Sequence, residues 1–475
     1  MTGAAGGGVE SGVAVVVLNY NGGEYLPACL RALAATDYPA ERLETVVVDN
    51  ASTDGSPEMV ERDFPAARLV RSGGNVGFAR GNNVGIHATT AEFVALVNPD
   101  TEVEPGWLRP LVRAMGEAPE IAAVCPKLLL YEDRLAICLD SATFVPRDAG
   151  MGTDERSLGL RVHSVVARTA AGTGLGVEFR GGFGGIEIDE QGREFRWTNG
   201  SGELGIFGGG EEAVITVEVS APRPDSELVS FVVGTMDDTL AGGQAGAELV
   251  REVAVARKSA WLRAGAVVQN AGSELLADGS SCDRGTLITG GSPYADWDGE
   301  PYTEARDVFS LCGAGVLLRR EPLLAVGGFD ERMFMYYEDT DLAYRLRRRG
   351  GRVRYAPGSV IRHHHAALAG EWSSFFLEQV TRNRIYVLLK HRSWRVAGRA
   401  LLALLRDTGR AGLAALRQTV LVPRHSSSAW QQVLPRAKAL AWLAWTAPAL
   451  LRARRVEKKL GGLTEEELAG WVVEA

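Results

Sequence analysis

Short apolar runs alternate with longer segments of mixed polarity over the first 135 residues of the chain. Residues 13–18 (VAVVVL), 43–48 (LETVVV) and 92–97 (EFVALV) are each followed by polar residues. The segments between them have helical spacing, and strands that alternate with helices predict βαβ units and a parallel sheet. Ligands of such sheets bind at the carboxyl ends of the strands, so the polar residues after each run are candidate ligand sites.

The pattern changes after residue 136. Glycine becomes frequent, and short alternating runs such as AVITVEVS and ELVSFVVG predict strands joined by turns. The mixed α/β pattern returns at residue 267, and the last part of the chain has helical spacing. We predict a discontinuous α/β domain of residues 1–136 and 267–391, an inserted all-β module of residues 137–266 with a sandwich or jelly-roll form, and a C-terminal helical region of residues 392–475.

Composition narrows the class of protein. A net charge of −8 over 475 residues argues against a general nucleic-acid binder, although the C-terminal region is rich in arginine and lysine. The five cysteines are scattered and form no CxxC pair, which does not suggest zinc and suits a reducing cytosol. The segment MTGAAGGGVESG has neither part of a signal peptide, and no apolar run reaches the roughly 18 residues that a spanning helix needs. We therefore expect a cytoplasmic protein.

Two acids follow the predicted strands closely. Asp49, in VVVDNASTDGS, stands at a strand end with Asp54 five residues later, where a carboxylate can accept hydrogen bonds from a nucleobase or ribose. The alternative is that these residues form a turn and cap the next helix. Asp100, in LVNPDTEV, can hold Mg²⁺ or Mn²⁺ against a diphosphate, or it can be a structural turn residue.

Two further motifs carry candidate ligands. The segment SGGNVGFARGNNVG lacks both the GxxxxGK[ST] and the GxGxxG pattern, so it is either a plain loop or a place where the backbone approaches a ligand closely. Three histidines follow in VIRHHHAAL, and on a strand His363 and His365 would share one face while His364 takes the other. An imidazole there can bind a transition metal, and a polar strand edge is the alternative.

The segment MYYEDTDLAYRLRRRG predicts a helix that begins with acids and ends with arginines. Asp341 and Arg345 are four residues apart and would form an ion pair on one helix face. Glu338 and Asp339 lie at the helix start, where the helix dipole favours carboxylates in any case. The dipole explains one of these two acids more readily than both, so one of them is a candidate general base.

These motifs occur in a set order over residues 13–135 and 267–391. They are VVVLNYNG, VVVDNASTDGS, GGNVGFARGNN, NPDT, LCGAGVLLRRE, GGFDERMFMYYEDTDLAYRLRRRG and HHH followed by TRNRIYVLLK. The ordered set resembles the family 2 inverting glycosyltransferases, in particular the branch of rhamnosyl- and galactofuranosyltransferases. The resemblance implies a GT-A fold, which is a Rossmann-like α/β domain that binds a nucleotide-diphospho-sugar donor. It also implies Mg²⁺ or Mn²⁺ as cofactor.

The resemblance assigns residues of this chain to roles. For the nucleotide-sugar these are Asn19, Asn21, Asp49, Asp54, Asn75, Arg80, Asn82 and Asp100. Asp100 matches the last acid of the DxD motif, whose first acid is replaced here by Asn98, and His363 matches a metal-side histidine with His365 as the alternative. Asp339 matches the general base of the ED motif, and Glu338 is its catalytic neighbour. A single displacement at the anomeric carbon would then transfer the sugar with inversion.

The resemblance also limits the expected partners. The donor of first choice is dTDP-rhamnose, with UDP-galactofuranose or another UDP-hexose as alternatives, and the acceptor is a glycan or lipid-linked glycan of the cell envelope or an exopolysaccharide. A catalytically silent carbohydrate-binding or scaffold protein on the same fold is the competing hypothesis. The insert is expected to bind carbohydrate or a partner protein, or to act as a spacer. The basic, Trp-rich C-terminal helices either contact the inner face of the plasma membrane or pack as ordinary helices.

Overall fold

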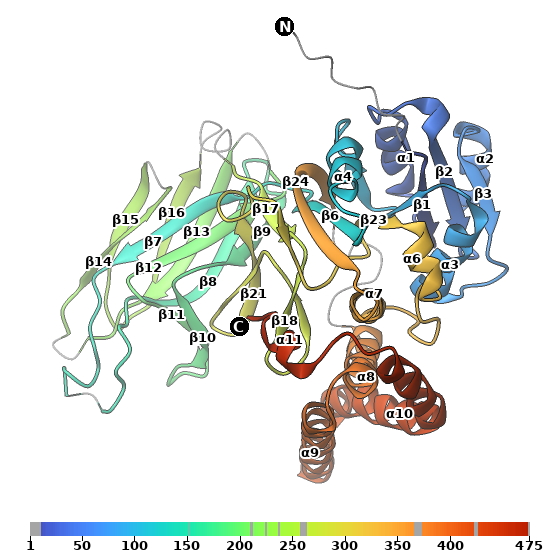
Figure 1. Ribbon diagram of the computed structural model, residues 1–475. Helices are drawn as coiled ribbons and strands as arrows, with labels where there is room; N and C mark the ends of the chain where they lie inside the picture. The colour runs from blue at the N-terminus through green and yellow to red at the C-terminus, as the bar shows by residue number, and fades with distance from the viewer. Residues whose placement is uncertain are drawn as a thin grey trace, which may run out of the picture. The chain divides into compact units, whose positions relative to one another are not determined.

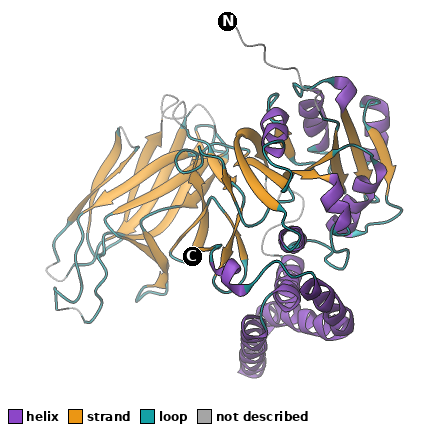
Figure 2. Ribbon diagram, viewed as in Figure 1, coloured by secondary structure: helices purple, strands orange, loops and turns teal. Residues whose placement is uncertain are grey.

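The computed structural model describes residues 11–150, 152–209, 212–223, 226–235, 238–256, 264–364, 373–421 and 426–473 (Figures 1 and 2). The chain divides into two compact units. The first unit comprises Met1–Leu129, Asn270–Arg284 and Glu300–Ala475, and the second comprises Leu130–Gln269 and Gly285–Gly299. The second unit thus includes residues 285–299, which lie outside the insert boundaries of 137–266 that the sequence pattern suggests.

A mixed sheet forms the centre of the first unit. Its strands run in the order β6-β23-β4-β1-β2-β3. They are β1 (Val13–Asn19), β2 (Leu43–Asp49), β3 (Arg68–Arg71), β4 (Phe93–Val97), β6 (Ile121–Leu130) and β23 (Gly315–Arg319). β1 pairs in parallel with both β2 and β4, as the alternating pattern predicts, whereas β23 runs antiparallel to β4. Buried valines, leucines and alanines of these strands form the core.

Helices cover this sheet, and one of them approaches it unusually closely. The helices that follow the N-terminal strands are α1 (Leu26–Ala34), the 3₁₀ turn η1 (Ala40–Arg42), α2 (Ser56–Asp63), α3 (Gly77–Ala88) and α4 (Leu108–Met115). A Cβ atom on Gly85 of α3 would lie 2.3 Å from Val16 Cγ1, and one on Gly81 would lie 2.5 Å from Leu18 Cδ1. The glycines of GFARGNNVG therefore let α3 pack directly on β1.

Later segments complete the first unit. The short strand β5 (Thr101–Val103) pairs with the long strand β24 (Arg352–His363), which also pairs with β22 (Arg306–Asp307). The helices α6 (Arg320–Ala325) and α7 (Glu338–Arg347) lie between β23 and β24 in the chain. A small sheet is built from β18 (Ser273–Leu276), β19 (Ser281–Asp283) and β25 (Val472–Val473).

The C-terminal part of the first unit is helical, as predicted. It consists of α8 (Ser374–His391), α9 (Trp394–Leu421), α10 (Ser426–Lys459) and α11 (Glu465–Ala469), whose buried side chains share one apolar cluster (Figure 1). The predicted capping box at the start of α11 is confirmed, since Thr464 Oγ1 accepts from the Glu467 backbone while the Glu467 side chain accepts from the Thr464 backbone. Among the described residues, none of the helices is long and apolar enough to span a bilayer.

The second unit is built of antiparallel strands (Figure 2). They are β7 (Leu135–Ser141), β8 (Arg161–Thr169), β9 (Gly174–Phe179), β10 (Phe183–Ile188), β11 (Glu194–Thr198), β12 (Ser201–Phe207), β13 (Ala213–Ser220), β14 (Val229–Gly234), β15 (Thr239–Ala245), β16 (Val250–Ala256), β20 (Thr286–Thr289) and β21 (Ser292–Trp297), with β17 (Val267–Asn270) at the chain boundary. Alternate side chains of β7, β12, β13 and β14 point into one shared core. The all-β character predicted for the insert is therefore observed.

A buried ion cluster joins α7 to α8. The predicted pair is present, with Arg345 Nε donating to Asp341 Oδ2 at 2.7 Å, and neither side chain reaches solvent appreciably. Two residues of α8 that the sequence did not indicate complete the cluster: Lys390 Nζ lies 2.7 Å and His391 Nε2 2.8 Å from Asp341 Oδ1. Burial acts to raise the pKa of Asp341, but Lys390, Arg345 and His391 outweigh it and hold that pKa well below its usual value.

Loss of this carboxylate should destabilise the first unit strongly. Asp341→Ala leaves Arg345 as a buried charge without its counterion and leaves Lys390 with Asp330 alone, so we expect a loss of about 3–5 kcal/mol in the free energy of unfolding. Denaturant unfolding followed by circular dichroism measures this. Asp63→Ala, which removes a solvent-exposed partner of Arg62, is the matched control and should leave the midpoint unchanged. Equal stability of Asp341→Ala and the unaltered protein would show that the cluster is not stabilising.

Candidate functional site

The carboxyl ends of β1 and β2 carry two connected loops. Asn19, the last residue of β1, is buried and donates from Nδ2 to Ser52 Oγ at 3.1 Å and to Ser56 Oγ at 2.7 Å. Its Oδ1 accepts from the Gly22 backbone at 3.2 Å. All polar atoms of the Asn19 side chain are thus used to hold the first loop against the second, so Asn19 positions the loops rather than offering atoms to a ligand.

Asn21 and Asp54 also tie these loops together. Asn21 Oδ1 accepts from the Thr53 backbone at 2.7 Å, and Asp54 Oδ2 accepts from the Gly23 backbone at 2.8 Å. Asp54 Oδ1 accepts from the backbone and hydroxyl of Ser56 at the start of α2. Burial acts to raise the pKa of Asp54, but these hydrogen bonds outweigh it and the pKa is lowered. The turn-forming alternative therefore describes the contacts of Asp54, whereas the N-cap of α2 is Gly55.

Asp49 differs from its neighbours because half of its carboxylate is uncommitted. Its Oδ1 accepts from the Ser52 backbone at 3.0 Å, and its Oδ2 accepts no hydrogen bond from the described residues. The side chain is 6% exposed, so the uncommitted oxygen lies at the base of the strand edge rather than in bulk solvent. A donor group of a nucleoside can satisfy this oxygen, as the strand-end position suggests.

The Gly- and Asn-rich loop is fixed by its own amides. Asn75 Oδ1 accepts from Asn50 Nδ2 and from the Gly77 backbone, each at 3.1 Å, while Asn82 donates to the carbonyl of Phe78 at 3.0 Å. Arg80 is largely exposed and lies 3.6 Å from Glu331. Arg80 is the one charged residue among the predicted donor-side residues of this loop, and its guanidinium group is accessible.

The start of α3 contacts the segment that precedes α7. The backbone N–H groups of Phe78 and Ala79 both point to the carbonyl of Phe334, at 2.6 and 3.4 Å. Gly77 adopts a positive φ of 81°, and a Cβ atom there would lie 2.5 Å from that carbonyl oxygen. Gly77 therefore permits a close backbone contact, and its partner in this structure is the carbonyl of Phe334 rather than a ligand.

Asp100 and His363 meet, as the predicted metal pair requires. β5 and β24 bring them together, and His363 Nε2 lies 3.2 Å from Asp100 Oδ1 in a buried position. The backbone of His364 donates to the Asp100 carbonyl at 2.9 Å. Burial acts to raise the pKa of Asp100, but the hydrogen bond and charge of His363 outweigh it and lower that pKa. Asp100 is accordingly ionised at neutral pH.

This pair fits a divalent cation in part. A carboxylate oxygen and an imidazole nitrogen are both ligands that Mn²⁺ accepts, and phosphate oxygens of a bound diphosphate would supply further ones. Within the described residues, no group of three or more His, Cys, Asp or Glu side chains gathers as a metal cluster. His365, the alternative ligand, lies outside the described residues.

Two tyrosines in unusual backbone conformations lead into α7. Tyr336 and Tyr337 have φ of 72° and 67°, a region that residues with a Cβ rarely occupy. Two such residues in succession cost of order 1–3 kcal/mol each and persist only when the surroundings hold them. The turn they form sets the direction in which Glu338 and Asp339 leave the helix start.

Asn383 of α8 holds this turn. It is fully buried, and its Nδ2 donates to the carbonyls of Met335 and Tyr336, both at 2.8 Å. One side-chain amide thus satisfies two carbonyls of the strained turn. Asn383 occurs in the TRNRIYVLLK motif, but no spacing rule in the sequence indicates that its partner lies 47 residues earlier.

The two acids at the start of α7 have different surroundings. Glu338 is buried, its Oε2 has no hydrogen-bond partner among the described residues, and burial together with the charge of Asp339 raises its pKa well above the usual value. Asp339 is partly exposed, and its Oδ1 accepts from the Thr340 backbone at 2.6 Å. Burial raises the pKa of Asp339 to about 6, with a further contribution from Asp283 and opposition from hydrogen bonds to Thr340 and Gly313. The pKa of Glu338 is therefore raised well above its usual value, while Asp339, with a pKa of about 6, is mostly ionised at pH 7.

A short loop connects Asp339 with the strand that leads to Asp100. The Gly313 backbone donates to the Asp339 carboxylate, and the next residue, Ala314, accepts from the Asn98 backbone at 3.1 Å. Asn98 begins the NPD segment that contains Asp100. In the sheet, β4 neighbours β1, and Asn19 at the end of β1 is paired with Asp49 at the end of β2. Asp49, Asp100 and Asp339 therefore lie along one edge of the sheet.

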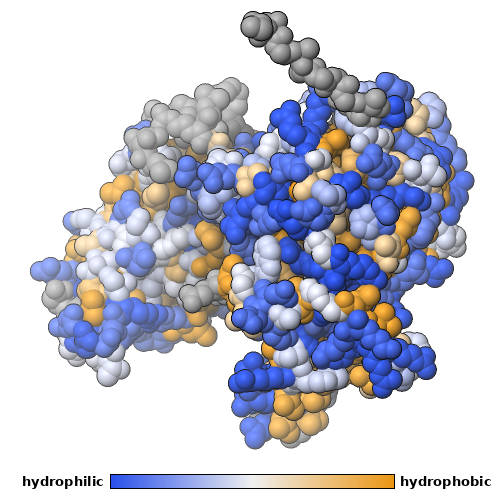
Figure 3. All heavy atoms as spheres, viewed as in Figure 1, coloured by the Kyte–Doolittle hydropathy of each residue, from blue (hydrophilic) through white to orange (hydrophobic). Residues whose placement is uncertain are grey.

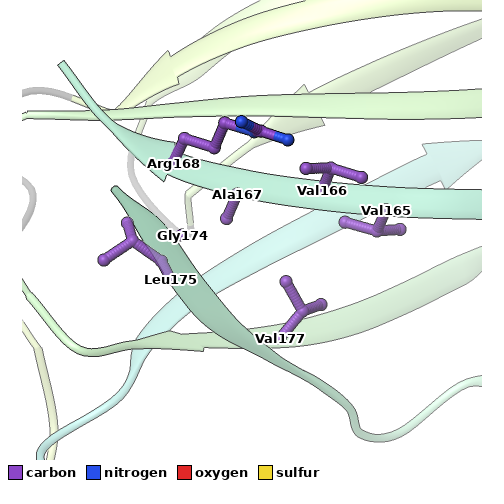
Figure 4. Close-up of a pocket in the computed structure, with 7 residues that line it drawn as sticks. All are labelled: Val165, Val166, Ala167, Arg168, Gly174, Leu175 and Val177. Carbon is purple, nitrogen blue, oxygen red and sulfur yellow. The ribbon is translucent and has the colours of Figure 1, made fainter. Parts of the chain in front are cut away.

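The second unit has a separate depression of about 450 Å³ (Figure 4). It is lined by Val165, Val166, Ala167, Arg168, Gly174, Leu175 and Val177 of β8 and β9. In Figure 4 the valine and leucine side chains line the space between these two strands. None of these lining residues is aromatic or acidic, and Arg168 is the only charged one. This depression is not part of the strand-edge site and lacks the usual features of a sugar-binding surface.

Two stretches of the chain match models of known protein families. Residues 14–135 match the family model described as Glycosyl transferase family 2, and residues 295–385 match the one described as Glycosyltransferase like family 2. These two stretches contain Asp49, Asp100, Asp339 and His363. Over these two stretches the chain matches glycosyltransferase family 2. The resemblance inferred from the ordered motifs is confirmed, and so is the α/β fold class with a β-rich insert and C-terminal helices.

Curated proteins similar to this chain include a rhamnosyltransferase. Over 158 residues the chain is 33% identical to the N-acetylglucosaminyl-diphospho-decaprenol L-rhamnosyltransferase of Mycobacterium tuberculosis. The aligned region covers 29% of this chain and 49% of that protein. Over 100 residues it is 32% identical to the poly(ribitol-phosphate) beta-N-acetylglucosaminyltransferase TarS of Staphylococcus aureus, covering 20% and 17%. The chain therefore spans about half the length, or less, of these curated relatives.

Solved structures resemble the chain more distantly. A mannosyltransferase from Pyrobaculum calidifontis, solved with GDP-Man and Mn²⁺, covers 92% of this chain at 14% identity and a TM-score of 0.37. TarS of S. aureus covers 25% at 27% identity and a TM-score of 0.23.

If this edge of the sheet catalyses a transfer reaction, Asn383 should affect its rate more than the binding of substrate. Asn383→Leu keeps the size of the side chain but removes both donors to the strained turn, so Asp339 should lose its fixed orientation. We expect kcat for a nucleotide-sugar substrate to fall about tenfold or more while KM stays within about twofold. Steady-state kinetics on the folded variant measures both.

Gln379→Leu is the matched control for Asn383→Leu. It also replaces a buried amide of α8, but that amide bonds to Arg382 rather than to the turn. Its thermal midpoint should fall while its kcat is retained. A similar loss of kcat in both variants would assign the effect of Asn383 to general stability of α8.

Proposed function

We propose that this family 2 protein is an inverting glycosyltransferase that moves a sugar from a nucleotide-diphospho-sugar to a hydroxyl of a glycan or lipid-linked glycan. The observation that carries the proposal is the single sheet edge that holds three carboxylates in different states. Asp49 has an uncommitted oxygen, Asp100 is paired with His363, and Asp339 is partly exposed with a pKa of about 6. Each state suits a different part of one transfer reaction.

Donor binding is assigned to the strand ends. The uncommitted oxygen of Asp49 accepts from the base or ribose, and the exposed guanidinium of Arg80 is available to the diphosphate. Asn19, Asn21, Asp54, Asn75 and Asn82 act by holding the surrounding loops, as their hydrogen bonds indicate. Of the eight predicted binding residues, two are thus assigned to contact the donor and five to shape the site, and the eighth, Asp100, is assigned to the metal.

Asp100 and His363 are the residues that would hold Mg²⁺ or Mn²⁺. Such a cation, when bound, neutralises charge on the leaving nucleoside diphosphate. Mn²⁺ suits the pair better than Mg²⁺, because an imidazole nitrogen is a good ligand for a transition metal and a poor one for Mg²⁺. The lowered pKa of Asp100 keeps its carboxylate in the ionised form that binds a cation.

The transfer step is a single displacement. The acceptor hydroxyl oxygen attacks the anomeric carbon while Asp339 accepts the hydroxyl proton, so that the new glycosidic bond forms as the bond to the diphosphate breaks. The nucleoside diphosphate leaves with the bonding electrons. Glu338, the buried neighbour of Asp339, has a pKa raised well above its usual value by burial and by the charge of Asp339, which disfavours a second negative charge next to the base. A pKa of about 6 makes Asp339 ionised at neutral pH yet more basic than an ordinary aspartate.

The sugar is proposed from similarity. The relative from M. tuberculosis is a rhamnosyltransferase at 33% identity, which makes dTDP-rhamnose the first donor to test and a lipid-linked glycan the first acceptor class. UDP-galactofuranose and other UDP-hexoses are the alternatives. A catalytically silent carbohydrate-binding or scaffold protein is the second hypothesis, and it predicts donor binding without release of nucleoside diphosphate.

Asp339→Asn tests the function directly. Release of nucleoside diphosphate is measured from a panel of dTDP-, UDP- and GDP-sugars, with Mn²⁺, with Mg²⁺ and with a chelator. We expect the unaltered protein to turn over one donor class, and Asp339→Asn to lose turnover while keeping donor affinity by calorimetry, because the amide cannot accept the proton.

Glu338→Gln is the matched variant for Asp339→Asn. Glutamine reproduces the shape of the neutral acid, so Glu338→Gln should retain more turnover than Asp339→Asn. Equal turnover of Asp339→Asn and the unaltered protein would remove Asp339 from the role of base. Donor binding without turnover in the unaltered protein, with any donor and metal, would favour the silent scaffold.

The transfer rate should depend on pH through Asp339. Its pKa is raised to about 6, so the proton-accepting form is lost as the pH falls through that value. We expect kcat to level off above about pH 7 and to fall about tenfold per unit below pH 6. A rate profile between pH 5 and 8, with donor affinity measured at each pH, checks this. An acid limb near pH 4 would indicate an unperturbed carboxylate instead.

A further inference from the structure

Helix α9 presents an exposed apolar stripe that the reaction does not use. The stripe consists of Trp394, Leu402, Leu405, Leu413 and Leu416, each between 47% and 67% exposed. Along the chain these residues follow one another at intervals of eight, three, eight and three positions, which places them on one side of a helix. Gly398, Gly409 and Gly412 fall on the same side, and a Cβ atom on any of them would meet no other atom within 4 Å.

The stripe is not the side by which α9 packs onto the protein. The packed side carries Ala397, Leu404 and Ala415, which are buried, and the first two belong to the apolar cluster shared with α8 and α10. α9 thus has two apolar sides, and the described residues cover one of them. A helix that needed only internal packing would carry polar residues on the outer side.

Arginines border the exposed stripe along its whole length. They are Arg395, Arg399, Arg406, Arg410 and Arg417, all exposed and all within about 60° of one another around the helix axis at 3.6 residues per turn. The one acid of α9, Asp407, lies farther from the stripe and pairs with Arg406 at 3.0 Å. Figure 3 shows hydrophobic side chains gathered on the surface of α9 with hydrophilic ones beside them.

We propose that α9 lies flat in the headgroup region of a bilayer that contains anionic lipid. The stripe would enter the boundary of the acyl chains, while the arginines would bind lipid phosphates at the same depth. The 28 residues of α9 form a rod of about 42 Å, long enough for the stripe to contact the surface over several turns. α9 is not a spanning helix, which is consistent with binding along the surface.

Charge favours a lipid surface over a second copy of this chain. α9 has five arginines against one acid, and the adjacent α10 has seven basic residues against Glu457 alone. This part of the chain is strongly basic although the whole chain has a net charge of −8. Two such helices brought together in a dimer would repel, whereas anionic headgroups neutralise both.

Vesicle binding tests the proposal independently of the transfer reaction. Sedimentation with vesicles of phosphatidylcholine mixed with phosphatidylglycerol should deplete the full-length protein from solution, and vesicles of phosphatidylcholine alone should bind it about tenfold or more weakly. Added salt should weaken binding to the mixed vesicles. Equal affinity for both vesicle types, or binding to neither, would overturn the proposal. Since no site residue lies on α9, a protein that binds vesicles but lacks turnover would contradict the proposed function and not this inference.

Paired variants locate the binding surface. Leu402→Asp with Leu413→Asp should reduce binding to the mixed vesicles about tenfold or more, because two charges would enter the acyl boundary. Leu228→Asp with Leu249→Asp, which alters two exposed leucines in loops of the second unit, should bind like the unaltered protein. Equal effects of the two pairs would contradict a role for the stripe.

The arginines have a matched control of their own. Arg399→Gln with Arg406→Gln should weaken binding about tenfold or more, whereas Arg31→Gln with Arg113→Gln removes the same charge from exposed positions on α1 and α4 and should not. Thermal midpoints confirm that each variant is folded. Light scattering completes the test: a dimer that dissociates on Leu402→Asp with Leu413→Asp would mean that a second copy covers the stripe, and would overturn the lipid assignment.

Discussion

The buried carboxylate of Asp341 fixes the two helices on which the proposed chemistry depends. It contacts Arg345 of its own helix and Lys390 and His391 of α8, and all four side chains are buried. A displacement of one helix relative to the other would separate Asp341 from Lys390 and His391, and loss of such buried contacts is costly in a medium of low dielectric constant. α7 carries Asp339 and α8 carries Asn383, so the same constraint that joins the helices also sets the position of the base relative to the amide that holds its turn.

The two neighbouring acids show how position alone separates their chemistry. Glu338 and Asp339 have similar intrinsic acidities, but Glu338 is buried and Asp339 is partly exposed. The pKa of Glu338 is raised well above its usual value, whereas that of Asp339 is raised to about 6. The strained tyrosine turn lies directly before these two acids. The conformational strain of Tyr336 and Tyr337 is offset by hydrogen bonds from Asn383 and by the packing of α8.

The sequence alone predicted those parts of the fold and site that depend on local spacing. Apolar runs located the parallel strands, four-residue spacing predicted the Asp341–Arg345 pair, and a three-residue spacing predicted the capping box of α11. The ordered motifs also placed Asp100 and His363 in one site although 263 positions separate them. Contacts without a spacing rule were missed, namely Asn383 with the tyrosine turn and Lys390 and His391 with Asp341. The sequence also could not distinguish Asp49, which keeps an oxygen uncommitted, from Asp54, whose oxygens bind backbone, because the difference lies in loop geometry and not in residue type.

The glycines of α3 have a consequence for how the two sides of the site move. Gly81 and Gly85 seat α3 directly on β1, and the first N–H groups of the same helix bind the carbonyl of Phe334, two residues before the tyrosine turn. Direct contacts therefore connect β1, the start of α3 and the segment that precedes Asp339. A nucleotide that displaced the start of α3 would also displace the carbonyl of Phe334, to which that helix start is hydrogen-bonded. In the proposed reaction, occupancy of the donor side and alignment of Asp339 would then be coupled rather than independent.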